Sequence, residues 1–302
     1  MFDVVIIGAG PSGMTAAIYA KRSGLNPLLL EMSAPGGQIN KTAIIENYPG
    51  YKQIDGPSLS MKIFEQVTSL EIEYRYGSVL EIYDENDIKV IKTDQEEIRT
   101  KTIIVATGRK ARELGIENER RLTGRGISWC AVCDGPLFKD KDVVVIGGGN
   151  SAAEESLYLA DIVKSITLVH RRDELRADCI ICDKVKNNNK INIMWDSIPL
   201  KFNEENNKLQ SVTIKNIKTN EEKDISCAGA FVYIGFVPST DMLKNYDIMD
   251  ESGYIITDEN MRTKVKGIYA SGDVRKKELF QITTAISDGA IAAISVNKDL
   301  NI

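Results

Sequence analysis

The sequence predicts an α/β protein with two nucleotide-binding domains, the second inserted into the first. Two Gly-rich turns support this prediction, Gly8–Gly13 and Gly147–Ala152, because each follows an apolar, β-branched run and precedes a helix-forming stretch. A Cys-x-x-Cys pair, Cys130 and Cys133, lies shortly before the second turn. A chain of 302 residues is also long enough for two hydrophobic cores. Two nucleotide sites and a dithiol in one chain are typical of an enzyme that transfers electrons.

The first turn is expected between a buried strand at Asp3–Gly8 and a helix at Met14–Arg22. In such a turn the first glycine permits a tight bend, the second lets the backbone approach a pyrophosphate, and the third lets the helix pack on the strand. A second apolar strand, Asn26–Glu31, ends in an acid 18 residues after Gly13, which suits a contact with a ribose hydroxyl. Gly-rich turns also occur for packing reasons alone, but the whole pattern favours a dinucleotide site.

The second turn repeats the first with an offset of 139 residues, and the repeat predicts which nucleotide binds there. The counterpart of Glu31 is His170, so a basic cluster replaces the acid: His170, Arg171, Arg172 and Arg176. A carboxylate would repel a 2′-phosphate, whereas guanidinium groups bind one through paired hydrogen bonds. The second site is therefore expected to prefer NADPH to NADH. The alternatives are that the arginines form a solvated helix face and that His170 is an ordinary surface residue.

The pair Cys130 and Cys133 has the spacing of a redox dithiol that closes a small, reversible disulfide. Asp134 follows directly and is a candidate proton donor or acceptor for these thiols. Two other readings are small buried side chains and half of a zinc site. A second pair, Cys179 and Cys182, raises the zinc alternative, but 45 residues separate the pairs. We expect Cys179 and Cys182 to pack on one face of a helix, Cys227 to lie in the core, and no metal site.

Composition excludes several classes of protein. The net charge of −5 argues against nucleic acid or an anionic membrane as the main partner. The hydrophobic content of 43% and the charged content of 27% are those of a soluble globular protein. Met1 leads within two residues into the first expected strand, and no apolar run is long enough to span a bilayer. These features predict a cytoplasmic protein whose cysteines are reduced, catalytic or buried.

The order of segments predicts that the chain leaves the first domain and returns to it. The expected boundaries give a first domain from residues 1–113 and 241–302 and an inserted domain from residues 114–240. The inserted part contains the dithiol, the second turn and the basic cluster, and it ends in the strand Ala230–Pro238. The first domain then resumes with Gly267–Asp273 and a helix of small residues at Ala285–Ser295.

Along essentially its whole length the chain resembles the bacterial-type, low-molecular-weight thioredoxin reductases, which are pyridine nucleotide-disulfide oxidoreductases. The stretches that carry the resemblance are Gly8–Gly13, Gly36–Gln38, Glu46–Gly50, Ala106–Gly108, Cys130–Gly135, Gly147–Glu155, His170–Arg172, Tyr269–Val274 and Gln281. The resemblance implies two Rossmann-like, three-layer ββα domains, with FAD in the first and NADPH in the inserted one. It also implies a homodimer whose protein substrate is thioredoxin.

Particular site residues follow from the same resemblance. The residues implied to hold FAD are Gly8, Gly10, Ser12, Gly13, Glu31, Gly37, Gln38, Asn47, Asp273, Gln281 and Ile282. The residues implied to hold NADPH are Gly149, Asn150, Ser151, His170, Arg171, Arg172, Arg176 and Gly235. Cys133 would be the sulfur next to the flavin, Cys130 the one that attacks the partner's disulfide, and Asp134 the proton donor.

The chain also departs from the family pattern. Phe280 stands where an arginine is usual, Arg109 and Lys110 stand where small residues are usual, Ser287 replaces a common glycine, and the pair Cys179/Cys182 is additional. Three alternative functions remain open at this stage. They are a reductase of another thioredoxin-like or glutaredoxin-like carrier, a flavin dithiol oxidase, and a zinc-stabilised nucleotide sensor.

Overall fold

The structure is a computed structural model that describes residues 1–42 and 45–301. The chain divides into two compact units: unit 1 consists of Met1–Lys110 and Val237–Ile302, and unit 2 of Ala111–Phe236. The boundaries expected from the sequence lie a few residues further along the chain. Unit 2 is thus an insertion within the sequence of unit 1.

A seven-stranded sheet forms the centre of unit 1, with the order β3-β2-β1-β6-β5-β4 and with β17 also paired to β6. Its strands are β1 (Phe2–Ile7), β2 (Pro27–Glu31), β3 (Glu73–Tyr76), β4 (Val79–Glu85), β5 (Ile88–Thr93), β6 (Glu97–Val105) and β17 (Ile268–Ala270). β3, β2, β1, β6 and β17 are parallel, whereas β4, β5 and β6 form an antiparallel meander. The first half of β6 pairs with β5 and its second half with β17, so the meander branches from the parallel sheet.

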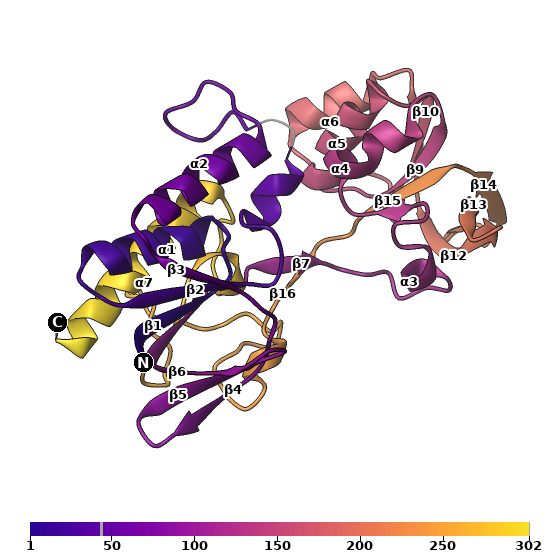
Figure 1. Cartoon of the computed structure of the whole chain (residues 1–302). Coiled ribbons are helices and arrows are strands. Elements are labelled where there is room, and N and C mark those ends of the chain that lie inside the picture. The colour runs from indigo at the N-terminus through magenta and orange to yellow at the C-terminus, as the bar shows by residue number, and fades with distance from the viewer. Residues whose placement is uncertain (43–44, 302) are drawn as a thin grey trace. The chain divides into compact units, whose positions relative to one another are not determined.

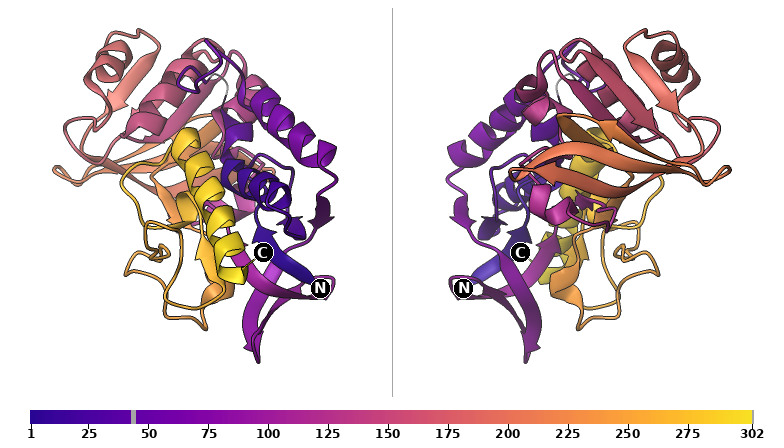
Figure 2. Two further views of the ribbon diagram at one scale, coloured as in Figure 1. Left: turned by 90° about the vertical axis from the view of Figure 1, so that its left-hand side faces the viewer. Right: turned by 90° about the vertical axis from the view of Figure 1, so that its right-hand side faces the viewer.

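Three helices cover one face of this sheet: α1 (Pro11–Arg22), α2 (Gly56–Ser69) and α7 (Ile282–Leu300) (Figure 1). The position of β1 between two hydrophobic cores explains why its sequence is a continuous apolar run. Val4 and Ile6 pack toward the helices, while Val5 and Ile7 pack into a second core on the opposite face. The remaining helical turns of unit 1 are η1 (Gly37–Lys41), η3 (Asp241–Leu243) and η4 (Gly272–Val274). Figure 2 shows α7, in yellow, beside the indigo α1.

Unit 2 contains a five-stranded parallel sheet with the order β11-β10-β9-β15-β8. Its strands are β8 (Ile127–Ser128), β9 (Asp142–Gly147), β10 (Ser165–Val169), β11 (Ile191–Met194) and β15 (Gly229–Tyr233). Its helical segments are α3 (Glu119–Leu122), α4 (Ala131–Asp134), η2 (Gly135–Phe138), α5 (Asn150–Ala160) and α6 (Cys179–Lys186). A separate antiparallel sheet consists of β12 (Ser197–Glu205), β13 (Lys208–Asn216) and β14 (Glu222–Ser226) (Figure 2).

The internal repeat is visible in the strand order of both units. In unit 1, β1 lies between β2 and β6, and in unit 2, β9 lies between β10 and β15, each with parallel pairing. The predicted fold class, two Rossmann-like domains, is therefore confirmed. The two stretches that connect the units, β7 (Arg109–Ala111) and β16 (Phe236–Pro238), pair with each other. Among the described residues, no helix has the length and apolar character needed to cross a membrane.

Candidate active site

The first Gly-rich turn joins β1 to α1 and has the close approaches that its glycines predict. A Cβ atom on Gly13 would lie 1.8 Å from the carbonyl oxygen of Gly8, so only glycine fits there. A Cβ on Gly10 would meet nothing within 4 Å, which leaves the backbone at the start of α1 open to a ligand. Gly37 borders the same space, because a Cβ built on it would lie 3.5 Å from Gly10 Cα. This concave backbone suits a pyrophosphate.

Glu31 ends β2 beside this turn and is buried, with 8% of its surface exposed. Its Oε2 accepts a hydrogen bond from the backbone N–H of Ala9 at 2.7 Å, and its Oε1 accepts two from Ser33. The carboxylate therefore holds the turn and the end of the second strand together. Its position at the strand end is the one from which an acid contacts the ribose of a dinucleotide.

Other residues predicted to hold FAD are hydrogen-bonded to residues distant in sequence. Asn47 Nδ2 donates to Gln281 Oε1 at 3.1 Å, and Ser12 Oγ donates to Ser271 Oγ at 2.8 Å. Gln38 Nε2 donates to the carbonyl oxygen of Arg109 at 2.9 Å. Ile282 begins α7 and packs in a small apolar cluster around Ile39, Ile45 and Leu59.

Asp273 lies in η4 and interacts with two cations. Arg109 Nη2 is 3.2 Å from its Oδ2, and Lys277 Nζ is 3.4 Å from its Oδ1. The guanidinium carbon of Arg109 lies 3.9 Å from the centre of the Phe280 ring. Two of the departures from the family pattern, Arg109 and Phe280, are thus in contact with each other. In this chain the side chain at position 280 therefore carries no charge of its own but supports a stacked cation.

Replacing Phe280 with leucine is expected to weaken FAD binding about fivefold, because the loss of the cation–π contact costs roughly 1 kcal/mol and releases the cation that is paired with Asp273. The dissociation constant, measured from recovery of free flavin fluorescence, checks this. Leu279→Ala changes the exposed neighbour and serves as the control. Equal FAD affinity in both variants would contradict a contribution of the Phe280–Arg109 contact to FAD binding.

Asp288 was not predicted, although it fixes the η4 turn. This buried carboxylate in α7 accepts a hydrogen bond from the backbone N–H of Gly272 at 3.1 Å. Arg275 and Lys277 both lie within 3.3 Å of its oxygens. The available signal in the sequence was an acid in the middle of a stretch of small and apolar residues, Ala285–Val296, since such an acid is buried only when paired.

Cys130 and Cys133 form a disulfide, with Cα atoms 5.3 Å apart, at the start of α4. The predicted pairing of these two sulfurs is confirmed. Cys130 is buried and Cys133 is exposed. Asp134, the last residue of α4, is half-buried. Behind the helix, the hydroxyl of Tyr233 accepts a hydrogen bond from the N–H of Ala131 at 2.8 Å and so anchors the dithiol segment to the end of β15.

Glu155 of α5 is a second acid in this region that sequence reasoning missed. Burial raises its pKa to about 7, and the nearby charge of Glu154 adds to the effect. Among the described residues, its Oε2 has no hydrogen-bond partner. Burial also raises the pKa of Tyr233, and the charges of Glu155 and Asp134 act in the same direction. The charges of Glu155 and Asp134 thus both act on Tyr233, whose hydroxyl is hydrogen-bonded to the dithiol segment at Ala131.

Replacing Glu155 with glutamine is expected to stabilise unit 2 by about 3 kcal/mol above pH 7 and to have little effect below pH 4.5. The unfolded carboxyl loses its proton near pH 4.5 and the folded one only near pH 7. The stabilising contribution of the protonated acid is therefore complete below pH 4.5 and is lost as the pH rises through 7. Both tryptophans, Trp129 and Trp195, lie in unit 2, so their fluorescence in urea reports its unfolding.

The exposed acid Glu222 provides the matched control, Glu222→Gln, which should leave the pH dependence of unfolding unchanged. If Glu155→Gln were no more stable than the unmodified protein at pH 8, the raised pKa of Glu155 would be contradicted.

The second Gly-rich turn joins β9 to α5 and, like the first, leaves the backbone at the start of its helix open to a ligand. A Cβ on Gly149 would meet nothing within 4 Å, and Asn150 and Ser151 are exposed in the first turn of α5. Gly235 is exposed just beyond β15, with an open side and a positive φ of 110°. These residues are placed at the carboxyl ends of β9 and β15, where open parallel sheets bind nucleotides.

Arg171, Arg172 and Arg176 are exposed in the segment after β10, and the N–H of Arg176 donates to the carbonyl oxygen of Gly148 at 2.7 Å. This hydrogen bond ties the basic cluster to the turn. The suggestion that His170 is a surface residue was wrong, because only 3% of it is exposed. Its ring fills the space beside Gly148, where a Cβ would lie 2.1 Å from His170 Nδ1, and burial lowers its pKa.

The second cysteine pair differs in part from expectation. Cys182 is buried and Cys227 lies in the core, as predicted. Cys179 is exposed as the first residue of α6, so its assignment as a packing residue was wrong. Within the described part of the chain, no group of three or more His, Cys, Asp or Glu residues is arranged to hold a metal ion.

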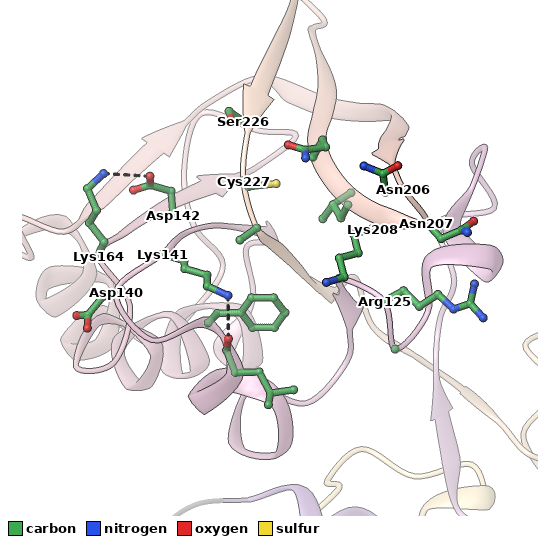
Figure 3. Close-up of a pocket in the computed structure, with 17 residues that line it drawn as sticks. Arg125, Asp140, Lys141, Asp142, Lys164, Asn206, Asn207, Lys208, Ser226 and Cys227 are labelled. Carbon is green, nitrogen blue, oxygen red and sulfur yellow. Dashed lines mark hydrogen bonds and ion pairs between the residues drawn. The ribbon is translucent and has the colours of Figure 1, made fainter.

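A hollow of about 920 Å³ in unit 2 lies away from these residues. It is bordered by the start of β9, near Asp142, and by the turn around Asn206 and Asn207 (Figure 3). Lys164 is paired with Asp142 at its rim. Because Asp142 is at the amino end of β9 and Gly147 at the carboxyl end, the hollow is at the opposite edge of the sheet from the Gly-rich turn.

Comparison with known proteins agrees with this arrangement. A family model described as pyridine nucleotide-disulphide oxidoreductase matches residues 2–289. The thioredoxin reductase of Bacillus subtilis (strain 168) is 45% identical over 296 residues, which cover 98% of this chain and 94% of that protein. The structure of Lactococcus lactis thioredoxin reductase has a TM-score of 0.94 and 50% identity, covering 99% of this chain and 98% of the other. That of T. acidophilum thioredoxin reductase has a TM-score of 0.92 and 35% identity, covering 100% and 99%.

FAD and NADPH, the two cofactors expected of a pyridine nucleotide-disulphide oxidoreductase that reduces a disulfide, both fit the residues of this chain. The open backbone at Gly10 beside Glu31 fits the first nucleotide, and the open backbone at Gly149 beside the exposed arginines fits the second. With two such turns, a disulfide between Cys130 and Cys133, and a family match over nearly its whole length, the chain belongs to the pyridine nucleotide-disulphide oxidoreductases.

Proposed function

We propose that this chain is an NADPH-dependent flavoprotein that reduces the disulfide of thioredoxin. The observation that carries the proposal is the Cys130–Cys133 disulfide in a chain with two open nucleotide-binding turns, the second beside three exposed arginines. In this assignment unit 1 binds FAD and unit 2 binds NADPH. Bound FAD accepts two electrons from NADPH and passes them to a disulfide, which side chains alone cannot do.

The chain's own residues then complete the transfer of electrons to the acceptor. In the reduced dithiol, the thiolate of Cys130 attacks the acceptor's disulfide, forms a mixed disulfide and releases one acceptor thiolate. Asp134 supplies the proton to that thiolate. Cys133 next attacks the sulfur of Cys130, which restores the Cys130–Cys133 disulfide and releases the second acceptor thiol. Tyr233 holds the backbone at Ala131 in place during both steps.

The residues that bind the cofactors have distinct tasks in this proposal. Glu31 holds the adenosine ribose of FAD, and Gln38, Asn47, Asp273 and Gln281 surround its flavin end. Arg171, Arg172 and Arg176 bind the 2′-phosphate of NADPH. The active form is a homodimer and it works in the cytoplasm, where cysteines outside a catalytic pair are mostly free thiols, as Cys227 is here.

An anaerobic titration tests donor, cofactor and acceptor together. NADPH should bleach the visible absorbance of the purified flavoprotein, and oxidised thioredoxin should restore it. If NADPH bleaches the flavin but thioredoxin does not restore it, a glutaredoxin-like or other carrier is the acceptor. If oxygen alone restores it at the rate of turnover, the protein is a dithiol oxidase. No bleaching by NADPH would mean that another compound donates the electrons.

A further inference from the structure

The second cysteine pair is not used in the proposed reaction, and its surroundings indicate a role of its own. Cys179 is the first residue of α6, and Cys182 follows one turn later. We propose that Cys179 and Cys182 are a second redox-active dithiol, which is oxidised by low-molecular-weight disulfides and thereby weakens the binding of NADPH to unit 2. The effect on NADPH rests on the proposed function, whereas formation of the disulfide does not.

The backbone places the two cysteines within the range of a disulfide. Residues three apart in an α-helix lie on one face, with Cα atoms about 5 Å apart. Disulfides span roughly 4.4–6.8 Å between Cα atoms. The same chain already closes Cys130 and Cys133 over 5.3 Å, with the same spacing and also at the start of a helix.

The exposures of the two cysteines divide the roles of attacking and resolving thiol between them. Cys179 is exposed, and so is its neighbour Ile180, with 72% of its surface open to solvent. A disulfide of low molecular weight can therefore reach the sulfur of Cys179. Cys182 is 9% exposed, and its Sγ donates a hydrogen bond to the carbonyl oxygen of Ala177 at 3.2 Å. Of the two cysteines, only Cys179 can react with a disulfide in solution, and Cys182 is placed to resolve the mixed disulfide that results.

The exchange balances without any further reactant. Cys179, as the thiolate, attacks the external disulfide, forms a mixed disulfide and releases one external thiolate, which takes up a proton. Cys182 then loses its proton and attacks the sulfur of Cys179, releasing the second external thiol. Two protein thiols are oxidised to one disulfide, and one external disulfide is reduced to two thiols.

Oxidation would act on the segment that carries the basic cluster. A disulfide removes the hydrogen that Cys182 donates to Ala177 and so breaks the contact. The neighbouring Asp178 accepts from Asn150 Nδ2 at 3.1 Å, and its N–H donates to Asn150 Oδ1 at 2.9 Å. Arg176, two residues earlier, is hydrogen-bonded to Gly148. The start of α6, where the disulfide would form, is therefore joined by hydrogen bonds to the second Gly-rich turn and lies next in sequence to the arginines.

The experiment uses the full-length, FAD-loaded protein with Cys130→Ser and Cys133→Ser, so that the first dithiol does not interfere. After treatment with oxidised glutathione, intact mass should show the loss of two hydrogens, and peptide mapping should place the disulfide at Cys179–Cys182. NADP⁺ carries the same 2′-phosphate as NADPH but cannot reduce the flavin, so its dissociation constant, measured by calorimetry, stands for that of NADPH. This constant should rise about tenfold and return with dithiothreitol. Cys182→Ser should stop at a glutathione adduct on Cys179.

Cys227→Ala removes a core cysteine and is the matched control, which should still form the disulfide. Thermal unfolding of each variant before treatment shows that it is folded. Absence of a Cys179–Cys182 disulfide would overturn the proposal, and a disulfide that leaves the NADPH constant unchanged would overturn its effect on binding. Failure of the reduced protein to bind NADPH would instead count against the proposed function, since the mass measurement is independent of it.

Discussion

Replacing Cys133 with serine is expected to lower the steady-state rate of thioredoxin reduction by roughly a thousandfold or more. A hydroxyl cannot form the disulfide that Cys130 and Cys133 make, so electrons can no longer leave through the dithiol. The transfer from NADPH to FAD needs neither sulfur. Rapid-mixing absorbance should therefore show flavin reduction by NADPH at an unchanged rate, together with loss of NADPH consumption in the presence of thioredoxin.

The two single serine variants also separate the roles of the sulfurs. The resemblance assigns the attack on the acceptor to Cys130, so Cys133→Ser should accumulate a covalent complex with thioredoxin and Cys130→Ser should not. Cys130 is the more buried of the two, and a complex formed only through Cys133 would reverse the roles. Cys179→Ser, at an exposed cysteine of the same unit, is the control that should retain turnover under anaerobic conditions. Full activity in Cys133→Ser would exclude a dithiol mechanism.

Replacing Arg171 and Arg172 together with alanine is expected to narrow the preference for NADPH over NADH. Each lost hydrogen bond to a charged group is worth about 1–3 kcal/mol, or roughly 5- to 150-fold in affinity. The side chains are exposed on the segment after β10, where only the 2′-phosphate distinguishes the two nucleotides. The ratio of kcat/KM for NADPH to that for NADH measures the change. The KM for NADPH should rise while that for NADH stays nearly constant.

Arg120→Ala is the matched control, since Arg120 is also an exposed arginine of unit 2 and pairs only with Glu113 among the ion pairs described. It should leave the nucleotide preference intact. Unchanged discrimination in the Arg171/Arg172 variant would mean that the offset of 139 residues between the two repeats misplaced the phosphate site.

Much of the fold followed from local sequence patterns. Buried parallel strands require apolar residues on both faces, and Asp3–Gly8 and Asp142–Gly147 meet that requirement while ending in glycine. The strand β2 ends at Glu31, where the sequence placed an acid near the first turn, and the hydrogen bond from Ala9 brings the two together. Such features depend on a few consecutive residues and on standard strand–turn–helix geometry, so they can be read without tertiary contacts.

The features that the sequence did not reveal depend on contacts between distant segments. Neither Arg109 nor Phe280 signals this contact by itself, because it forms only when the start of β7 lies beside the loop that precedes α7. The raised pKa of Glu155 depends on how deeply α5 is buried, which helical periodicity does not determine. Helical spacing likewise placed Cys179 and Cys182 on one face, but it did not show that only Cys182 lies deep enough to be covered.

The pairing of β7 with β16 bears on how such a chain could have arisen. Because these two short strands are hydrogen-bonded neighbours, residues 111–236 begin and end at almost the same place. No strand of the seven-stranded sheet in unit 1 is interrupted by them, since β6 ends at Val105 and β17 begins at Ile268. A domain whose termini are adjacent can be inserted at one point of another domain, so a gene duplication could have placed unit 2 there. For the same reason, another domain with adjacent termini could replace unit 2 without changing the path of the chain in unit 1.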